Sequence, residues 1–205
     1  MASIKSSFGK KNDIEDLFEE EENTNMNITV EDNKVMFYTD VSVQSCLRLQ
    51  QCLNDAKRFA AMYNATKEFG EDMKVYLHIC SDGGDVFASL TVIDFILQSK
   101  VDIVTICEGS VASAGVLISL AGKERYIRRN AYMLIHEIRS GCLGKYSEMQ
   151  EEMKNNDRIM SDLKSYMNER CNNKLLKKKL NKVLKKDVLW NANRCIKYGL
   201  VQKIV

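Results

Sequence analysis

One serine in this sequence stands where a nucleophile would gain most from the surrounding backbone. Ser113 lies in a run of small residues, 109–115, between an apolar β-branched segment (101–106) and an apolar segment able to continue as a helix. A strand, a turn and a helix would place Ser113 at a helix N-terminus, where free N–H groups and the helix dipole favour developing negative charge. The structural alternative is that Ser113 only caps that helix or fills a tight contact.

Two further residues have the chemistry to act with Ser113. His136 follows the apolar segment 131–135, and histidine is the usual general base for a serine nucleophile. Asp187 follows a lysine-rich segment and could accept a hydrogen bond from the other ring nitrogen, although a lone aspartate is often only a turn or cap residue. The order serine, histidine, aspartate, with Val111 two residues before the serine, excludes the α/β-hydrolase pattern.

Alternating strand and helix patterns must position these three residues. The expected strands are 34–39, 75–80, 101–106, 131–135 and 200–205, and the expected helices include 45–69, 86–100 and 191–198, the last capped by Gly199. This alternation predicts an α/β fold with parallel pairing, in which ligands bind beyond the carboxyl ends of the strands. The double glycine Gly83-Gly84 falls at such an end, and we expect the amide of Gly84 to point into the site, although a double glycine is most often just a turn.

Residues 145–170 predict a long helix with a narrow apolar stripe. The stripe consists of Tyr146, Met149, Met153, Met160, Leu163 and Met167, at spacings that include repeated steps of three and four. The remaining positions are strongly polar. The pattern therefore leaves two interpretations open, a core helix or a helix that projects from the body and pairs with another chain.

Two charged segments lie near the ends of the sequence. Residues 1–27 predict an acidic arm that is solvated, in which Ile14, Leu17 and Phe18 could dock on a partner. The lysine-rich segment 174–186 could touch nucleic acid or an acidic membrane, but we expect its leucines to pack inward and its lysines to form a solvated face.

Composition limits the class of protein. The length of 205 residues predicts one domain over 28–205. The net charge of +2 is too small to produce a strong electrostatic field that would attract nucleic acid. No apolar run reaches membrane-spanning length, and no secretory pattern opens the sequence. Seven cysteines without a Cys-x-x-Cys pair predict free thiols in a reducing compartment, and two histidines without a ligand cluster predict no structural zinc site.

Taken together, four motifs in order resemble the proteolytic subunit of the caseinolytic (Clp) protease, the ClpP family. They are Ser-Asp-Gly-Gly-Asp at 81–85, Gly-Ser-Val-Ala-Ser-Ala-Gly at 109–115, Met-Leu-Ile-His at 133–136, and Asp187 followed by Ala192 and Tyr-Gly-Leu-Val at 198–201. The resemblance covers residues 34–205. It implies the crotonase-like (ClpP-type) βα superhelix, with 145–170 as a projecting handle helix that joins two heptameric rings.

The resemblance also implies a role for each matching residue. Ser113 would be the nucleophile, His136 the general base and Asp187 its orienter, while the backbone amides of Gly84 and Ala114 would form the oxyanion hole. The implied protein is an ATP-dependent Clp protease proteolytic subunit, a serine endopeptidase that cuts unfolded proteins inside a tetradecamer. It would carry no metal or cofactor, because a separate AAA+ unfoldase of the Clp type uses the ATP. We expect no nucleic-acid or membrane partner and a cytoplasmic location, or an organellar stroma or matrix, or the host cytoplasm if the source is viral.

Other functions are kept as alternatives. An inactive or regulatory ring subunit that assembles with an active paralogue is disfavoured, because all three catalytic residue types are present. An acyl-CoA enzyme of the crotonase-like fold would generally use a glutamate rather than a serine–histidine pair. Two departures from the family bear on assembly, namely Glu137-Ile138 in place of Gln-Pro and Lys186 in place of Arg. We expect Glu137 to pair with a basic neighbour such as Lys186 between rings, a contact that salt and acid would weaken.

Overall fold

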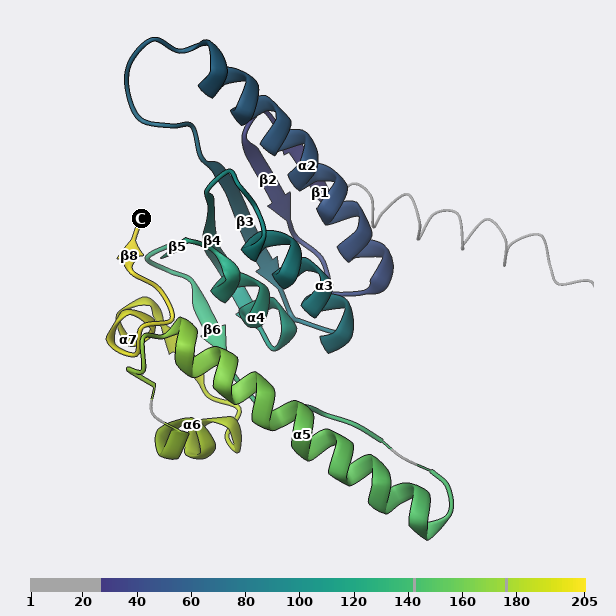
Figure 1. Ribbon diagram of the computed structural model, residues 1–205. Helices are drawn as coiled ribbons and strands as arrows, with labels where there is room; N and C mark the ends of the chain where they lie inside the picture. The colour runs from purple at the N-terminus through teal and green to yellow at the C-terminus, as the bar shows by residue number, and fades with distance from the viewer. Residues whose placement is uncertain (1–26, 142, 176) are drawn as a thin grey trace, which may run out of the picture.

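A single, mostly parallel sheet forms the centre of the molecule (Figure 1). The computed structural model describes residues 27–141, 143–175 and 177–205, so the predicted arm lies almost entirely outside the described residues. The strands are β1 (Ile28–Glu31), β2 (Lys34–Phe37), β3 (Val75–Ser81), β4 (Ile103–Ala112), β5 (Glu124–Ile127), β6 (Tyr132–Leu134), β7 (Leu189–Asn191) and β8 (Lys203–Ile204). Their order is β1-β2-β3-β4-β5-β8, with β6 paired to β4 and β7 paired to β6. Only the pairs β1–β2 and β6–β7 are antiparallel among the described strands.

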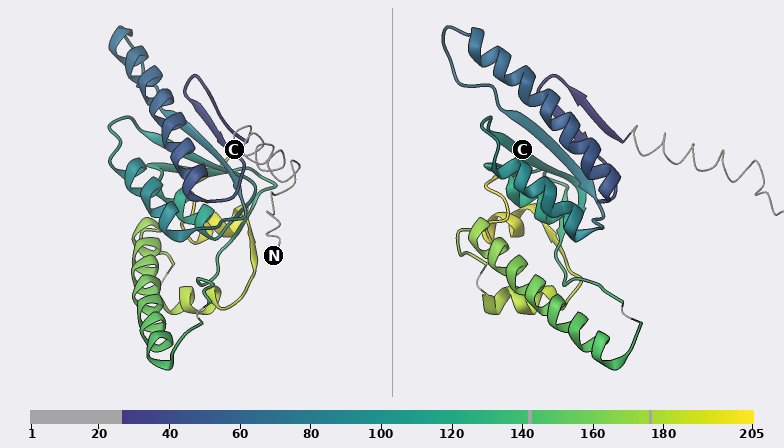
Figure 2. Two further views of the ribbon diagram at one scale, coloured as in Figure 1. Left: turned by 90° about the vertical axis from the view of Figure 1, so that its right-hand side faces the viewer. Right: turned by 45° about the vertical axis from the view of Figure 1, so that its right-hand side comes forward.

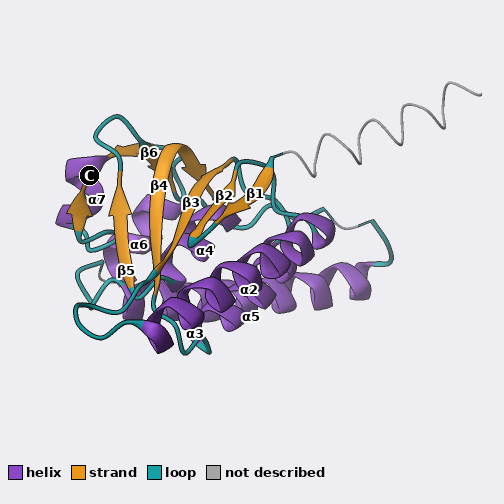
Figure 3. Ribbon diagram, turned by 90° about the horizontal axis from the view of Figure 1, so that it is seen from above, coloured by secondary structure: helices purple, strands orange, loops and turns teal. Residues whose placement is uncertain are grey.

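Helices connect the parallel strands and cover one face of the sheet (Figure 3). They are α2 (Val43–Thr66), α3 (Val86–Leu97), α4 (Ala114–Ala121), α5 (Tyr146–Arg170), α6 (Lys177–Leu184) and α7 (Ala192–Lys197). The first three pack against the sheet, whereas α5 and α6 lie beyond its far end (Figure 1). This confirms the predicted α/β fold with parallel strands.

Local sequence explains where the crossover helices begin. Ser42 and Ser45 form a reciprocal capping box at the start of α2, in which each hydroxyl accepts from the other residue's backbone N–H, at 3.1 and 2.8 Å. The Asp85 carboxylate accepts from the N–H of Ala88 at 3.1 Å and so caps α3. Because the Asp85 cap directly follows Gly83-Gly84, it fixes where the glycine loop ends.

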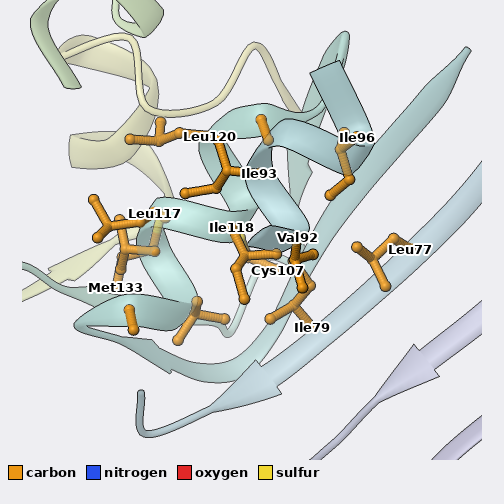
Figure 4. Packing of buried hydrophobic residues seen from close by; sticks show 14 of the residues in the cluster. Leu77, Ile79, Val92, Ile93, Ile96, Cys107, Leu117, Ile118, Leu120 and Met133 are labelled. Carbon is orange, nitrogen blue, oxygen red and sulfur yellow. The ribbon is translucent and has the colours of Figure 1, made fainter. Parts of the chain in front are cut away.

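The core lies between the sheet and its covering helices (Figure 4). Strand β3 alternates buried and half-buried residues, which directs Leu77 and Ile79 at the helices. Helices α3 and α4 contribute Val92, Ile93, Ile118 and Leu120 to the same core, and all four are almost fully buried. Since α4 is buried along its whole length, packing fixes the helix that begins at Ser113.

The structure corrects three sequence expectations. Strand β1 precedes the strand expected to be first, and β7 was not expected at all. Strand β4 runs to Ala112, so most of the small-residue run 109–115 is strand rather than turn. The end of β4 pairs in parallel with β6, for example Val111 with Met133, and this distant partner supplies the hydrogen bonds that keep small residues extended.

Helix α5 is anchored at one end and projects at the other (Figure 2). Leu163 and Met167 are buried, whereas Tyr146 and Met153 are 73% and 68% exposed. The Arg170 guanidinium donates to the carbonyls of Leu120 and Gly122 at 2.7 Å each, which ties the C-terminal end of α5 to the end of α4. The projecting helix was predicted.

Two compositional predictions concern the cysteines and the lysine-rich segment. The six described cysteines are free thiols and five of them are buried, as predicted, while Cys142 lies outside the described residues. In the lysine-rich segment, the described apolar side chains of Leu175, Leu180, Val183 and Leu184 are buried. Lys179, Lys182 and Lys185 are exposed, so the predicted solvated face is confirmed for these residues.

Candidate active site

Ser113 occupies the strained turn between β4 and α4. Its backbone has φ 52° and ψ −122°, a conformation that costs a residue other than glycine about 1–3 kcal/mol. Its N–H donates to the carbonyl of Leu134 at 3.0 Å, which holds the turn against β6. The Ser113 side chain makes no capping hydrogen bond, so the alternative that this serine merely caps the helix does not hold. The half-buried hydroxyl is therefore available for chemistry.

Gly83 packs directly against Ser113, and Gly84 packs against Val41, because neither glycine carries a side chain. A Cβ on Gly83 would lie 2.5 Å from the Cβ of Ser113, and a Cβ on Gly84 would lie 2.2 Å from the carbonyl oxygen of Val41. Both glycines have positive φ, 99° and 139°. Val41 holds the loop by donating to the carbonyl of Gly83 at 2.7 Å and accepting from the N–H of Asp85 at 2.8 Å. The loop thus has a specific backbone geometry that substitution would destroy.

Two backbone N–H groups beside Ser113 are unused. Among the described residues, neither the amide of Gly84 nor that of Ala114 donates a hydrogen bond to another group. The amide of Ala114 belongs to the first turn of α4, where N–H groups have no partner within the helix and the dipole favours negative charge. These are the two amides that the sequence predicted for an oxyanion hole.

His136 follows β6 by two residues, so the strand that pairs with the end of β4 brings it near Ser113. Its Nδ1 lies 2.6 Å from the carbonyl oxygen of Glu137. Because a carbonyl can only accept, Nδ1 carries the hydrogen in this contact. In the neutral ring that leaves Nε2 as the basic nitrogen, the tautomer that a general base requires.

Asp187 is held by a residue that the sequence interpretation missed. Its Oδ2 accepts from Nη2 of Arg139 at 2.8 Å, in an ion pair whose side chains are 57% and 74% exposed. Among the described residues, no hydrogen bond joins Asp187 to His136, and none joins His136 to Ser113. The structure thus places the serine and histidine at one site and leaves the aspartate outside it. The only feature of the sequence that pointed to this ion pair was the position of Arg139, three residues after the candidate base His136.

An apolar pocket of about 430 Å³, open to solvent, connects the serine and the histidine. Both residues line it together with Ala114 and Lys164, and Asp187 does not. The apolar lining comes from α3, α4, α5, the end of α6 and the segment that follows β6. Its residues are Val86, Val116, Leu117, Ile135, Ile138, Met160, Leu163, Met167 and Leu184. Such a lining fits an apolar side chain placed next to the serine hydroxyl.

Comparison with known proteins agrees with this geometry. The sequence model of the Clp protease family matches residues 36–205, which include the strained serine, the histidine and the aspartate. The chain belongs to the Clp protease family. It is also 31% identical over 133 residues to the ATP-dependent Clp protease proteolytic subunit 2 of Treponema pallidum (strain Nichols). That match covers 64% of this chain and 66% of the relative, just under two thirds of its length.

For a Clp protease family member, the surroundings of Glu137 bear on the expected contact between rings. The Glu137 N–H donates to the carbonyl of Leu184 at 3.0 Å, so the backbone after His136 runs beside the end of α6. Among the described residues, neither Glu137 nor Lys186 takes part in an ion pair. Their proposed pairing between rings therefore stays a prediction.

Other features of this Clp protease family member can be stated for the described part of the chain. There, no group of three or more His, Cys, Asp or Glu side chains could hold a metal ion. No helix in the same part has the length and apolar character needed to cross a membrane.

A second polar cluster lies on the other face of the sheet and was not recognised from the sequence. The Glu108 carboxylate contacts Nδ1 of His78 at 2.9 Å and accepts from Nε of Arg128 at 2.7 Å and from the hydroxyl of Tyr38. Burial raises the pKa of Glu108, but these three hydrogen bonds together hold it below its ordinary value. Every second residue of β3 faces this side of the sheet, away from the covering helices. The alternation of residue types along β3 was the feature of the sequence that could have indicated the cluster.

Proposed function

We propose that this chain is a proteolytic subunit of a Clp protease, a serine endopeptidase that hydrolyses peptide bonds of unfolded proteins. The observation that carries the proposal is the strained Ser113, with an uncapped hydroxyl, sharing a pocket with His136 beside the unused amides of Gly84 and Ala114. Membership of the Clp protease family supports the same function.

The proposed reaction is acyl transfer through the serine. Nε2 of His136 takes the hydroxyl proton while Oγ of Ser113 attacks the peptide carbonyl, and the carbonyl oxygen becomes an oxyanion held by the amides of Gly84 and Ala114. His136 then gives the proton to the leaving amine, and water hydrolyses the acyl-enzyme by the same route. Asp187 orients His136 once it leaves Arg139. The apolar pocket holds a substrate side chain next to the scissile bond.

The proposal includes the assembly that such a subunit needs. Two stacked heptameric rings, joined by α5, would enclose the active sites, and a Clp-type AAA+ unfoldase would use ATP to feed them unfolded chains. The subunit itself would need no cofactor, and its location would be cytoplasmic or an organellar or host equivalent. The exposed apolar residues on the projecting part of α5 support this arrangement.

A second candidate function is an inactive or regulatory ring subunit. The observation that favours it is the ion pair between Asp187 and Arg139, which leaves His136 without its orienter. Hydrolysis of a short fluorogenic peptide by the parent and by Ser113→Ala, with particle mass measured on both, separates the two. We expect the substitution to lower kcat/KM by roughly 10³-fold or more at unchanged mass. An inactive parent of ring size would instead support the regulatory subunit.

A further inference from the structure

A groove beside α6 carries five cationic side chains. The basic groove has a volume of about 780 Å³ and is lined by Lys179, Lys182, Val183, Lys185, Lys186, Val188, Trp190 and Arg194. Among the described residues, no acidic side chain lies within ion-pairing distance of these five cations. Asp187, their nearest acidic neighbour in sequence, pairs with Arg139. Five like charges around one concave surface repel one another, so an anionic occupant would stabilise the groove.

The apolar part of the basic groove limits which anion fits. Val183 and Val188 lie between the cations, so the occupant must offer apolar groups as well as negative charge. Trp190 is fully buried in the lining, with the Arg194 guanidinium 4.4 Å from its ring centroid, and its Nε1–H has no partner among the described residues. Proteins that bind single-stranded nucleic acid stack bases on accessible aromatic rings, and this ring is not accessible. An acidic peptide with apolar side chains fits better.

This chain contains such a peptide outside the described residues. Residues 13–22 carry seven carboxylates, those of Asp13, Glu15, Asp16, Glu19, Glu20, Glu21 and Glu22, around the apolar Ile14, Leu17 and Phe18. The acidic segment, as we call residues 13–22, therefore complements the basic groove in both charge and apolar content.

The position of the acidic segment favours a groove on another copy of the chain. Strand β1, which follows the arm, is an edge strand of the sheet and lies on the opposite side of the molecule from α6 (Figures 1 and 2). Glu22 is only five residues from Asn27, so it stays within roughly 17 Å of that end of the sheet. A chain of this length folds to a diameter of roughly 40 Å. By the same measure Glu19 reaches at most roughly 28 Å, so the four consecutive glutamates 19–22 favour a groove on another copy.

We propose that the acidic segment of one copy docks in the basic groove of a neighbouring copy. This contact goes beyond the proposed peptidase function, because it assigns a partner to a surface that no step of the reaction uses. It would link neighbouring copies through charges, and it would therefore weaken as salt rises.

Zero-length carbodiimide cross-linking of the full chain tests the proposal, because it joins a carboxylate to a lysine only where they touch. Isotopically heavy and light copies are mixed, cross-linked and digested. We expect mixed-isotope peptides that join residues 13–22 to the four groove lysines, Lys179, Lys182, Lys185 and Lys186, at a yield that falls at least tenfold in high salt. Trp190, the only tryptophan in the chain, provides a second readout, since its emission should shift with salt in the parent.

Charge reversal provides the controls. The double variant Lys182→Glu, Lys185→Glu removes two of the reactive amines, so it is scored on the cross-links from residues 13–22 to Lys179 and Lys186, which it should also lose. The variant Lys100→Glu, Lys203→Glu, with the same change in charge at exposed sites, should keep the cross-links to all four lysines. A combined variant carries the groove substitutions together with lysine at residues 19–22, so that the two surfaces again have opposite charges. Mixed-isotope cross-links should then return, now joining the lysines of residues 19–22 to the new glutamates in the groove. These readouts do not depend on peptide hydrolysis, so they remain informative if the proposed activity fails.

Three results would overturn the proposal. Cross-links confined to one isotope would place the contact within a single copy. Cross-links to Lys179 or Lys186 that survive charge reversal at Lys182 and Lys185 would mean that the charge of the basic groove does not hold the acidic segment. The third is a nucleic acid that cross-links to Lys182 or Lys185 at physiological salt while residues 13–22 form no cross-link, which would assign the basic groove to another kind of partner.

Discussion

Gly83 controls the position of the candidate nucleophile through its close backbone contact with Ser113. Its bare backbone lies against Ser113, and its φ of 99° suits glycine alone. We expect Gly83→Ala to lower the free energy of unfolding by about 1–3 kcal/mol or more and to abolish peptide hydrolysis, because the turn must shift. Chemical denaturation and a peptidase assay measure the two effects. Gly141→Ala, at a position with open space around it, is the matched control and should change neither.

Arg139 is expected to compete with His136 for the carboxylate of Asp187. An exposed ion pair is worth at most about 1 kcal/mol, so releasing Asp187 requires little free energy. We expect Arg139→Ala to raise kcat by up to about fivefold with little change in stability, the rate change that corresponds to that free energy. Arg139→Lys keeps the charge and should stay close to the parent. A lower kcat in Arg139→Ala would instead assign Arg139 a supporting role in the active site.

The residues that do chemistry were easier to predict than the contacts among them. Ser113 and His136 each stand at the end of an apolar segment, and residue types and local pattern were enough to select them. The partner of Asp187 was not predictable in this way, because Arg139 is 48 residues away along the chain. Pairing between distant surface charges depends on the final fold and contributes little energy, so local sequence carries little trace of it.

Among the elements, strand β4 shows why sequence pattern misplaced a boundary. Gly109 and Ser110 have low strand propensity and were interpreted as a turn. In the structure the end of β4 lies between the ends of β3 and β6, and Ser110 pairs with Tyr132. Tertiary pairing overrides propensity here. By contrast, α2 and α5 were predicted to within a few residues, because their caps and periodicity are local.

The cluster around Glu108 joins β3 and β4 to the residues that directly follow β2 and β5, and its stability should depend on pH. Its native pKa lies below the ordinary value of 4.5, so its stabilising effect is present above pH 4.5 and is lost as pH falls through the native pKa. We expect Glu108→Gln to lower the free energy of unfolding by about 1–3 kcal/mol at neutral pH, because Tyr38, His78 and Arg128 lose a charged acceptor.

Urea denaturation at a series of pH values tests this prediction. The difference between parent and Glu108→Gln should shrink as the solution is acidified below pH 4.5, because the parent carboxyl then also becomes neutral. Glu31→Gln, an exposed glutamate of β1, is the control and should show almost no difference at any pH. A gap for Glu108→Gln that stays constant through acid pH would mean that packing, not charge, holds these strands together.

At the scale of the whole molecule, α5 presents apolar side chains that its own chain does not cover. Tyr146, Met149 and Met153 share one face of the projecting part and are 73%, 37% and 68% exposed. If this face joins the two rings, Met153→Glu places a charge in an apolar interface, which strongly opposes association. We expect the particle mass to fall by half, to a single ring, and peptide hydrolysis to fall with it.

The thermal stability of the Met153→Glu subunit itself should hardly change, because the parent side chain is already exposed. Lys154→Glu also introduces a glutamate, about a quarter of a turn away around the helix, and should leave the particle mass unchanged. This control separates an effect of the apolar face from an effect of charge on the helix. Mass measurement by light scattering or native mass spectrometry decides between the outcomes. An unchanged particle in Met153→Glu would mean that the rings meet through other surfaces. The charged contact expected around Glu137 would then have to carry the assembly, and the particle should dissociate in high salt.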